Sequence, residues 1–360
     1  MKYITNNDLL PLLFDMKKNV SFWDSRQNKI AESITHDEKW NYHINESGQS
    51  RYGLFALSNI LIAKNSFQLS TELYDEKIIK FILYVNNHIS YYSKSDLTYG
   101  GLTSLILAVK SYELNDIDIK EVERIFDETL DSVLKGCDNQ DSLILIAGKY
   151  LNDISPDLNR LKKLKSLTDR YLKSMNVTGY FETGDIRAIY HQRNMYILWG
   201  LIHASYFYAE RTEEIKNSVI KCLNWVWYNN RDKFDDAFHW HPAFYWTKNK
   251  YKIKVPVINI KSSRYLFECH QTFFANAVNF YQLRFNSYEF AKRKERAIEW
   301  IFGKNRIKKD LTEINGRMLP IRIMDLSGNI FINGQKFKGS YEVGSYILAL
   351  VAENYFRTYK

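Results

Sequence analysis

The chain has 360 residues, of which 45% are apolar and 25% charged, and this ordinary globular composition excludes a disordered or collagen-like protein. It contains only 15 Gly and 5 Pro, fewer than the usual ~7% and ~5%, so long regular elements, mainly helices, are expected. The net charge of +9 allows a polyanionic partner such as an acidic polysaccharide, although over this length it is also typical of a soluble surface.

The cysteines and the N-terminal segment bear on the compartment. Cys137, Cys222 and Cys269 are far apart and odd in number, which argues against a disulfide framework or a paired-cysteine metal site and favours a reducing compartment. No apolar segment with a small-residue cleavage site follows Met1, and the longest apolar stretch, Met195–Ala209, is too short to span a bilayer. We therefore expect a cytoplasmic protein without a membrane span.

Two classes of predicted helix alternate along the chain. Apolar helices rich in small residues are predicted to begin near Tyr52, Tyr99, Asp141, Tyr190, His270 and Tyr341. Between them, third-and-fourth spacing of apolar residues predicts amphipathic helices at roughly 70–88, 117–135, 158–175, 211–228 and 287–302. The spacing of the apolar starts leaves room for two helices each, so the alternation indicates helical hairpins.

This alternation predicts the fold class. If the apolar helices form an inner ring and the amphipathic helices an outer ring, roughly five to seven hairpins close into a toroid, whereas an open solenoid would show a tighter repeated consensus. No linker rich in Gly, Ser or Pro divides the sequence. We predict an all-α fold, an (α/α) toroid with short β-hairpin insertions, as a single domain over residues 1–360.

Two stretches break the helical pattern. In residues 251–261 apolar and basic residues alternate, and Pro256 restricts this segment to an edge strand or an extended loop. In residues 318–338 two apolar runs flank Asp325–Gly328, which suits a hairpin turn. Insertions of this length usually build binding sites.

The segment Thr178–Asn194 is the most informative one for chemistry. A glycine-containing polar loop leads into an apolar helix and delivers Tyr190, His191 and Asn194 to one turn, where they can share a face. Histidine exchanges protons near neutral pH, tyrosine can relay one, and Glu182 or Asp185 could orient the imidazole. The alternative is a helix start whose tyrosine and histidine only satisfy loop carbonyls.

The run Gly179–Glu182, followed by Tyr190 and His191 at the start of an apolar helix, resembles a segment of known enzymes. It is similar to heparinase II/III-like and alginate-lyase-like polysaccharide lyases, in which a loop containing Gly and Glu precedes a Tyr-His pair in an α/α toroid. Those lyases usually also carry a β-sandwich and a secretion signal, which we do not expect here. Unsaturated glucuronyl hydrolases and the helical domain of glucuronyl C5-epimerases are similar in size and act on the same sugar class.

A second group of candidates surrounds three histidines. His239 and His241 would face the same side of an extended segment, and Glu268 with His270 could complete a zinc site. The aromatic neighbours suit stacking on sugar rings instead: Trp240, Phe244, Tyr245 and Trp246. We therefore expect the histidines to line a cleft with no tightly held metal, and we expect no cofactor.

Polar residues at other helix starts complete the predicted site. The cluster His36–Tyr52 precedes the first apolar helix, and Glu342 lies in the first turn of the last one, where capping is the alternative role for its carboxylate. The basic run Phe290–Lys309 contains no recognisable nucleic-acid-reading motif, so a solvated face is expected there rather than nucleic-acid binding.

The leading functional prediction is β-elimination on a uronic-acid-containing poly- or oligosaccharide. Removing the proton next to a carboxylate requires a poised base and neutralisation of the carboxylate, and C5-epimerisation begins with the same step. The predicted catalytic residues are Tyr190, His191, Glu182, Glu268 and His270. The predicted substrate-binding residues are Arg187, Asn194, His239, Trp240, His241, Trp246, Arg264, Gln271 and Glu342. A glycoside hydrolase needs two acids, for which Glu182, Asp185, Glu268 and Glu342 are candidates, and a non-catalytic glycan-binding toroid is the remaining alternative.

Overall fold

The computed structural model describes residues 5–15, 21–36, 42–45, 51–114, 116–136, 140–181, 191–232, 235–239, 244–248, 253–258, 265–306, 308, 310–311, 313–314, 317–318, 323–325 and 337–359. Cα positions divide the chain into two compact units. Unit 1 comprises Met1–Ser132, Thr312–Arg322 and Ile332–Lys360, and unit 2 comprises Val133–Leu311 and Ile323–Phe331. A single domain over residues 1–360 stays a prediction.

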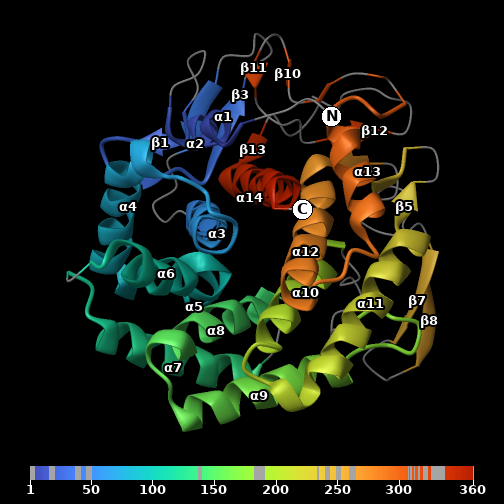
Figure 1. Ribbon diagram of the computed structural model, residues 1–360, viewed down its shortest axis with the longest axis horizontal. Helices are drawn as coiled ribbons and strands as arrows, with labels where there is room; N and C mark the ends of the chain where they lie inside the picture. The colour runs from blue at the N-terminus through green and yellow to red at the C-terminus, as the bar shows by residue number, and fades with distance from the viewer. Residues whose placement is uncertain are drawn as a thin grey trace. The chain divides into compact units, whose positions relative to one another are not determined.

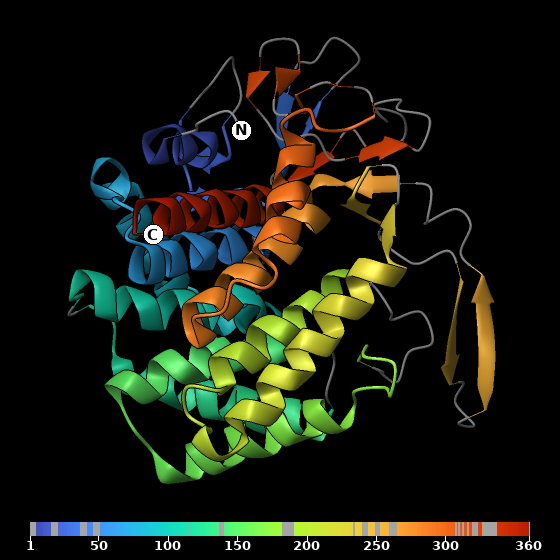
Figure 2. The same cartoon turned by 45° about the vertical axis from the view of Figure 1, so that its right-hand side comes forward.

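The core of unit 1 is a pair of long apolar helices, α3 (Arg51–Phe67) and α14 (Ser340–Thr358). They lie side by side although they are far apart in the sequence (Figure 1, Figure 2). Their backbones approach closely because Gly344 has no side chain: a Cβ there would lie 2.6 Å from the Cα of Ala56. Both helices are buried around most of their circumference, which explains why neither has a wide polar face.

Smaller elements surround this pair in unit 1. The other helices are α1 (Asn6–Leu9), α2 (Pro11–Phe14), α4 (Asp75–Asn87), α5 (Lys94–Asp96), α6 (Leu102–Tyr112) and α7 (Ile119–Lys135), the last of which continues into unit 2. The strands are β1 (Trp23–Asp24) paired with β2 (Lys29–Ile30), β10 (Glu313–Ile314) paired with β11 (Arg317–Met318), and an antiparallel sheet of β13 (Phe337–Gly339), β3 (Ser33–His36) and β4 (Tyr42–Asn45). The β13–β3 pairing holds the start of α14, where the Ser340 amide donates to the Glu32 carbonyl at 2.9 Å.

Unit 2 is built around α10 (His191–Ala204), which packs against four other helices (Figure 1). These are α8 (Ile144–Ile154), α9 (Leu158–Lys173), α11 (Thr212–Asn229) and α12 (Glu268–Phe285), and α13 (Ala291–Ile301) packs on α12 in turn. In the part of the chain that the structure describes, no helix is both long enough and apolar enough to cross a membrane.

The strands of unit 2 form two-stranded ribbons. These are β5 (Arg231–Asp232) with β6 (Ala237–Phe238), β7 (Phe244–Lys248) with β8 (Lys254–Ile258), and β9 (Tyr265–Phe267) with β12 (Ile323–Asp325). The predicted strand around Pro256 is confirmed as β8, and Figure 2 shows the ribbon that it forms with β7. The hairpin predicted around Asp325 stays a prediction, because its turn and second run lie in residues 326–336, outside the described part of the chain; its first run forms β12, which pairs with β9.

The predicted helix alternation is confirmed. The apolar class corresponds to α3, α6, α8, α10, α12 and α14, and the amphipathic class to α4, α7, α9, α11 and α13. The solvated face predicted for the basic run is wrong at Lys294, which is 3% exposed and donates from Nζ to Asn279 Oδ1 and Gln282 Oε1, both at 2.9 Å. The reason is tertiary, because α12 presents these two amides to the inner side of α13.

Gly200 is a point at which α10 tolerates no side chain. A Cβ there would overlap the Ser142 carbonyl oxygen, which is backbone and cannot rotate away. We expect Gly200→Ala to lower the free energy of unfolding by about 1–3 kcal/mol, although alanine is intrinsically the better helix former. Chemical denaturation measures the change. Gly136→Ala is the matched control, because a Cβ there meets nothing within 4 Å, and an equal loss in both variants would contradict this explanation.

Candidate active site

The first described residue of α10, His191, is fully enclosed and has a defined tautomer. Its side chain is 1% exposed, stacks on the Phe238 ring at 4.9 Å between centroids, and places Nε2 2.8 Å from the His270 carbonyl oxygen. Because a carbonyl oxygen only accepts, Nε2 carries the hydrogen and Nδ1 keeps the lone pair. Nδ1 of His191 has no hydrogen-bond partner among the described residues, so it is the nitrogen available to accept a proton.

The environment keeps this ring neutral. Burial lowers the pKa of His191 to about 3, the hydrogen bond to the His270 carbonyl opposes that shift, and the nearby His239 ring adds to it. At neutral pH the imidazole is therefore uncharged and can act as a base.

Two further histidines from separate elements lie near His191. His270, in the first turn of α12, is 2% exposed, and its ring centroid is 5.4 Å from that of His191. His239 follows β6 and is 9% exposed. The packing of α10 on α12 thus brings His191 and His270 together, and His239 lies close enough to lower the pKa of His191.

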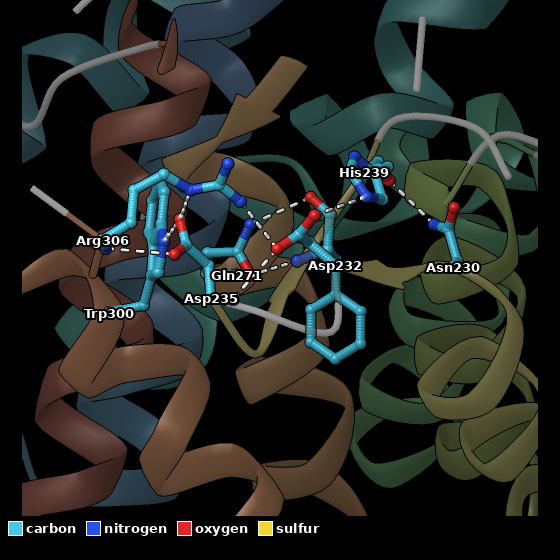
Figure 3. Close-up of polar contacts among 8 residues, drawn as sticks. Asn230, Asp232, Asp235, His239, Gln271, Trp300 and Arg306 are labelled. Carbon is cyan, nitrogen blue, oxygen red and sulfur yellow. Dashed lines mark hydrogen bonds and ion pairs between the residues drawn. The ribbon is translucent and has the colours of Figure 1, made fainter. Parts of the chain in front are cut away.

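Asn230 hydrogen-bonds to the backbone of His239, and Asp232 lies close to its ring (Figure 3). The Asn230 side chain donates from Nδ2 to the His239 carbonyl at 2.7 Å, and the His239 amide donates to the Asn230 carbonyl at 3.0 Å. The ring nitrogen Nε2 lies 3.7 Å from Oδ2 of Asp232, close enough for an ion pair when the ring is protonated.

Behind Asp232 lies a network that the sequence did not predict. Arg306 donates to Asp232 Oδ1 at 2.7 Å and, from Nε, to Asp235 Oδ2 at 3.0 Å, and the Trp300 indole also donates to Asp235 Oδ2 (Figure 3). The Asp235 amide donates to Asp232 Oδ1 at 2.9 Å. The sequence does show Asp232 and Asp235 a few residues before His239, and Arg306 after the end of α13. No local pattern, however, indicates that the arginine pairs with the two aspartates.

The side-chain amides of Gln271 and Asn194, both predicted to bind substrate, form hydrogen bonds with other groups of the protein. Gln271 accepts from the Phe238 amide at 2.8 Å and donates to the Phe238 and Phe267 carbonyls at 3.1 and 2.8 Å (Figure 3). Asn194 accepts from the Phe181 amide at 3.0 Å, which fastens the preceding loop to α10. These contacts position the strands and the loop around His191, and the predicted roles of both amides in substrate binding stay predictions.

The remaining predicted residues fall into three groups. Glu342, in unit 1, accepts from the Gly339 amide at 2.9 Å and from the Tyr341 hydroxyl at 3.2 Å, which is the capping contact considered as its alternative role. Glu268 is the first residue of α12 and is 1% exposed, and Trp246 lies in β7. Outside the described residues lie Glu182, Asp185, Arg187, Tyr190, Trp240, His241 and Arg264.

We expect Gln271→Met to destabilise unit 2 without altering a charge. The variant keeps an apolar side chain of similar length but leaves the buried Phe238 amide and two carbonyls without their partner, which typically costs about 1–3 kcal/mol. Thermal unfolding measures the loss. Gln192→Met, which removes an amide from a half-buried position on α10, serves as the control, and equal melting temperatures for the two variants would contradict the assigned role.

Comparison with known proteins identifies the fold. No protein-family model and no curated protein matches the sequence. Among solved structures, cellobiose 2-epimerase from Bacillus thermoamylovorans superposes with a TM-score of 0.68 at 11% identity, covering 92% of this chain and 95% of that one. An α-1,6-mannanase from Salegentibacter in complex with mannotetrose gives 0.57 at 9% identity, covering 97% and 96%. Unsaturated glucuronyl hydrolase from Streptococcus agalactiae gives 0.58 at 8% identity, covering 91% and 85%.

These neighbours are α/α-toroid carbohydrate-active enzymes. The chain has their fold, so the predicted fold class is confirmed. At these identities the likeness extends to the fold alone.

Proposed function

We propose that this protein is a carbohydrate-active enzyme that moves a proton at a sugar carbon next to a carbonyl group, and that epimerisation of that carbon is its reaction. The observation that carries the proposal is the neutral, fully buried His191, whose tautomer leaves Nδ1 as a base beside a second imidazole, that of His270. A hydrogen on such a carbon is only weakly acidic, so a positioned base is the first requirement of the reaction.

In the proposed step the C–H bond breaks, the proton moves to Nδ1 of His191, and the electron pair moves onto the carbonyl oxygen as an enolate. Reprotonation of the same carbon on its other face by His270, which begins the step as an imidazolium and ends it neutral, gives the epimer. His191 then releases its proton to solvent and His270 takes one up, which restores both groups. The negative charge that develops on the substrate raises the proton affinity of His191 during the step, because an opposite charge nearby favours the imidazolium.

One consideration favours epimerisation over hydrolysis. Cellobiose 2-epimerase from Bacillus thermoamylovorans superposes better, at 0.68, than the mannanase and the unsaturated glucuronyl hydrolase do, at 0.57 and 0.58. The likeness to the hydrolases supports a glycan or an oligosaccharide as the substrate class.

β-Elimination on a uronic-acid-containing glycan is the second candidate. Phe181, which belongs to the run that resembles polysaccharide lyases, donates its amide hydrogen to Asn194 on α10, one turn from His191. The proton-abstraction step is shared, but the enolate would then expel the substituent on the next carbon instead of being reprotonated.

One experiment separates these possibilities. The protein is incubated in D₂O with reducing disaccharides and with acidic oligosaccharides, and the products are followed by NMR and by ultraviolet absorbance. Deuterium at the carbon next to the carbonyl, together with a new epimer, supports the proposal. Absorbance of an unsaturated uronate supports the lyase, and new reducing ends without either signal support a hydrolase. Binding without any reaction would overturn the enzymatic proposal in favour of a non-catalytic glycan-binding toroid.

A further inference from the structure

The first turn of α12 fixes two sides of the His191 imidazole. The His270 carbonyl oxygen lies 2.8 Å from Nε2, at the edge of the ring. The next residue, Gln271, holds the backbone of Phe238: it accepts from the Phe238 amide at 2.8 Å and donates to the Phe238 carbonyl at 3.1 Å (Figure 3). Two consecutive residues of one helix therefore position the edge of the imidazole and the side chain that covers one of its faces.

Phe238 covers that face closely. Its side chain is 0% exposed, and its ring lies nearly parallel to the imidazole of His191, with 18° between the planes and 4.9 Å between the centroids. Aromatic rings in such an offset stack attract each other beyond the apolar area that they bury. With one face covered and Nε2 hydrogen-bonded, the imidazole has little freedom to turn, so Nδ1 keeps one direction.

The Phe238 ring is itself held by aromatic neighbours. The ring of Phe274 on α12 lies 4.4 Å from it between centroids, and that of Trp227 on α11 meets it in a T-shaped contact at 5.9 Å. The guanidinium groups of Arg231 and Arg293 lie over the Trp227 ring, 4.2 and 5.3 Å from its centroid. Because interiors are close-packed, the Phe238 ring cannot move away from the imidazole without displacing these side chains.

We propose that Phe238 is a positioning residue that fixes the plane of the His191 imidazole, and that its ring face stabilises the imidazolium formed when His191 takes a proton from the sugar. The second part of this inference rests on the proposed function. Before the reaction the stack joins two neutral rings. Proton transfer turns one of them into a cation, which the face of an aromatic ring attracts electrostatically. A contact that strengthens during the reaction raises the rate of the chemical step rather than the affinity for substrate.

Phe238→Leu tests the proposal, because leucine keeps an apolar side chain but removes the aromatic face. Phe274→Leu is the matched control, since Phe274 is equally buried and, among the described residues, has ring contacts with Phe238 and Trp227 but not with His191. We expect kcat to fall by roughly tenfold in Phe238→Leu, the rate equivalent of a buried cation–π contact, with KM unchanged. Phe274→Leu should keep the kcat of the unsubstituted protein. Solvent deuterium exchange into the sugar measures both rates.

A second measurement needs no turnover. In protein with ¹⁵N-labelled histidine, two-bond ¹H–¹⁵N correlations show which ring nitrogen carries the hydrogen, and the His191 signals are assigned from their loss in His191→Gln. We expect only the Nε2–H tautomer in the unsubstituted protein and in Phe274→Leu. Both tautomers should be present in Phe238→Leu, because the imidazole can then turn away from the His270 carbonyl.

These two measurements distinguish the possible failures. Both tautomers in the unsubstituted protein would overturn the inference whether or not the variants fold. A single tautomer in folded Phe238→Leu, or equal losses of kcat in the two leucine variants, would also overturn it. An inactive protein with the expected tautomers would reject the proposed function alone and leave Phe238 as the residue that orients His191.

Discussion

His191→Gln is expected to lower turnover by ~10²–10⁴-fold, the usual contribution of a positioned acid or base. The substitution removes the only ring nitrogen of His191 that is left to accept a proton, because Nε2 is committed to the His270 carbonyl. The glutamine amide can still donate a hydrogen bond, so the free energy of unfolding should change by only about 1 kcal/mol. Solvent deuterium exchange into the sugar measures the rate, and thermal unfolding measures the stability.

His203→Gln is the matched control for this prediction. His203 is a second buried histidine on α10, at the opposite end of the helix, and its Nδ1 donates to the Trp199 carbonyl at 2.7 Å. Both variants replace an enclosed imidazole by the same amide, but only one of them changes the candidate site. Unchanged turnover in folded His191→Gln would remove His191 from the mechanism, and equal losses in both variants would show that the effect is structural.

The second expected result is a steep loss of stability in acid. Burial lowers the pKa of His191 to about 3 and that of His203 to about 4, in each case against the backbone hydrogen bond, which favours the charged form. In the unfolded chain both rings titrate near the ordinary value of ~6.5. Between those values the unfolded state binds more protons than the folded state, so the free energy of unfolding falls as the pH drops below about 6.5.

The size of this effect follows from the width of the pH window. Each ring contributes about 1.4 kcal/mol for every pH unit between its folded and unfolded pKa values. From pH 7.5 to pH 4.5 the two rings together should lower the free energy of unfolding by about 5 kcal/mol, a large part of the usual ~5–15 kcal/mol. Denaturant unfolding at a series of pH values measures the curve.

Substitution isolates each contribution, because other groups also titrate in acid. In His203→Gln, about half of the histidine-dependent fall in the free energy of unfolding with decreasing pH should be lost. In the double variant with His191→Gln, nearly all of it should be lost. His88→Gln is the control, since His88 is only half-buried. If the free energy of unfolding depends on pH in the same way in the double variant and in the unsubstituted protein, other groups cause the acid destabilisation.

Much of the fold could be predicted from local sequence pattern. Apolar spacing along the chain identified both helix classes, since a helix that is buried on one side or on all sides must carry apolar residues at those positions. The boundaries of α9 and α11 were predicted to within a few residues, and the alternation of the two classes indicated the toroid. The same reasoning identified His191 and His270, because both lie where a polar segment meets an apolar helix.

The rest was decided by tertiary structure. Strand pairing depends on which edges meet, so nothing in the local sequence indicated that β12 pairs with β9, more than fifty residues earlier in the chain. The basic run indicated solvent exposure, yet Lys294 is buried because Asn279 and Gln282 on the neighbouring helix satisfy its charge. The sequence alone identified His191, His239 and His270 as candidates. Only the packed chain brings Arg306 to Asp232 and Asp232 to His239, because charges that compensate one another in a buried place need no proximity along the sequence.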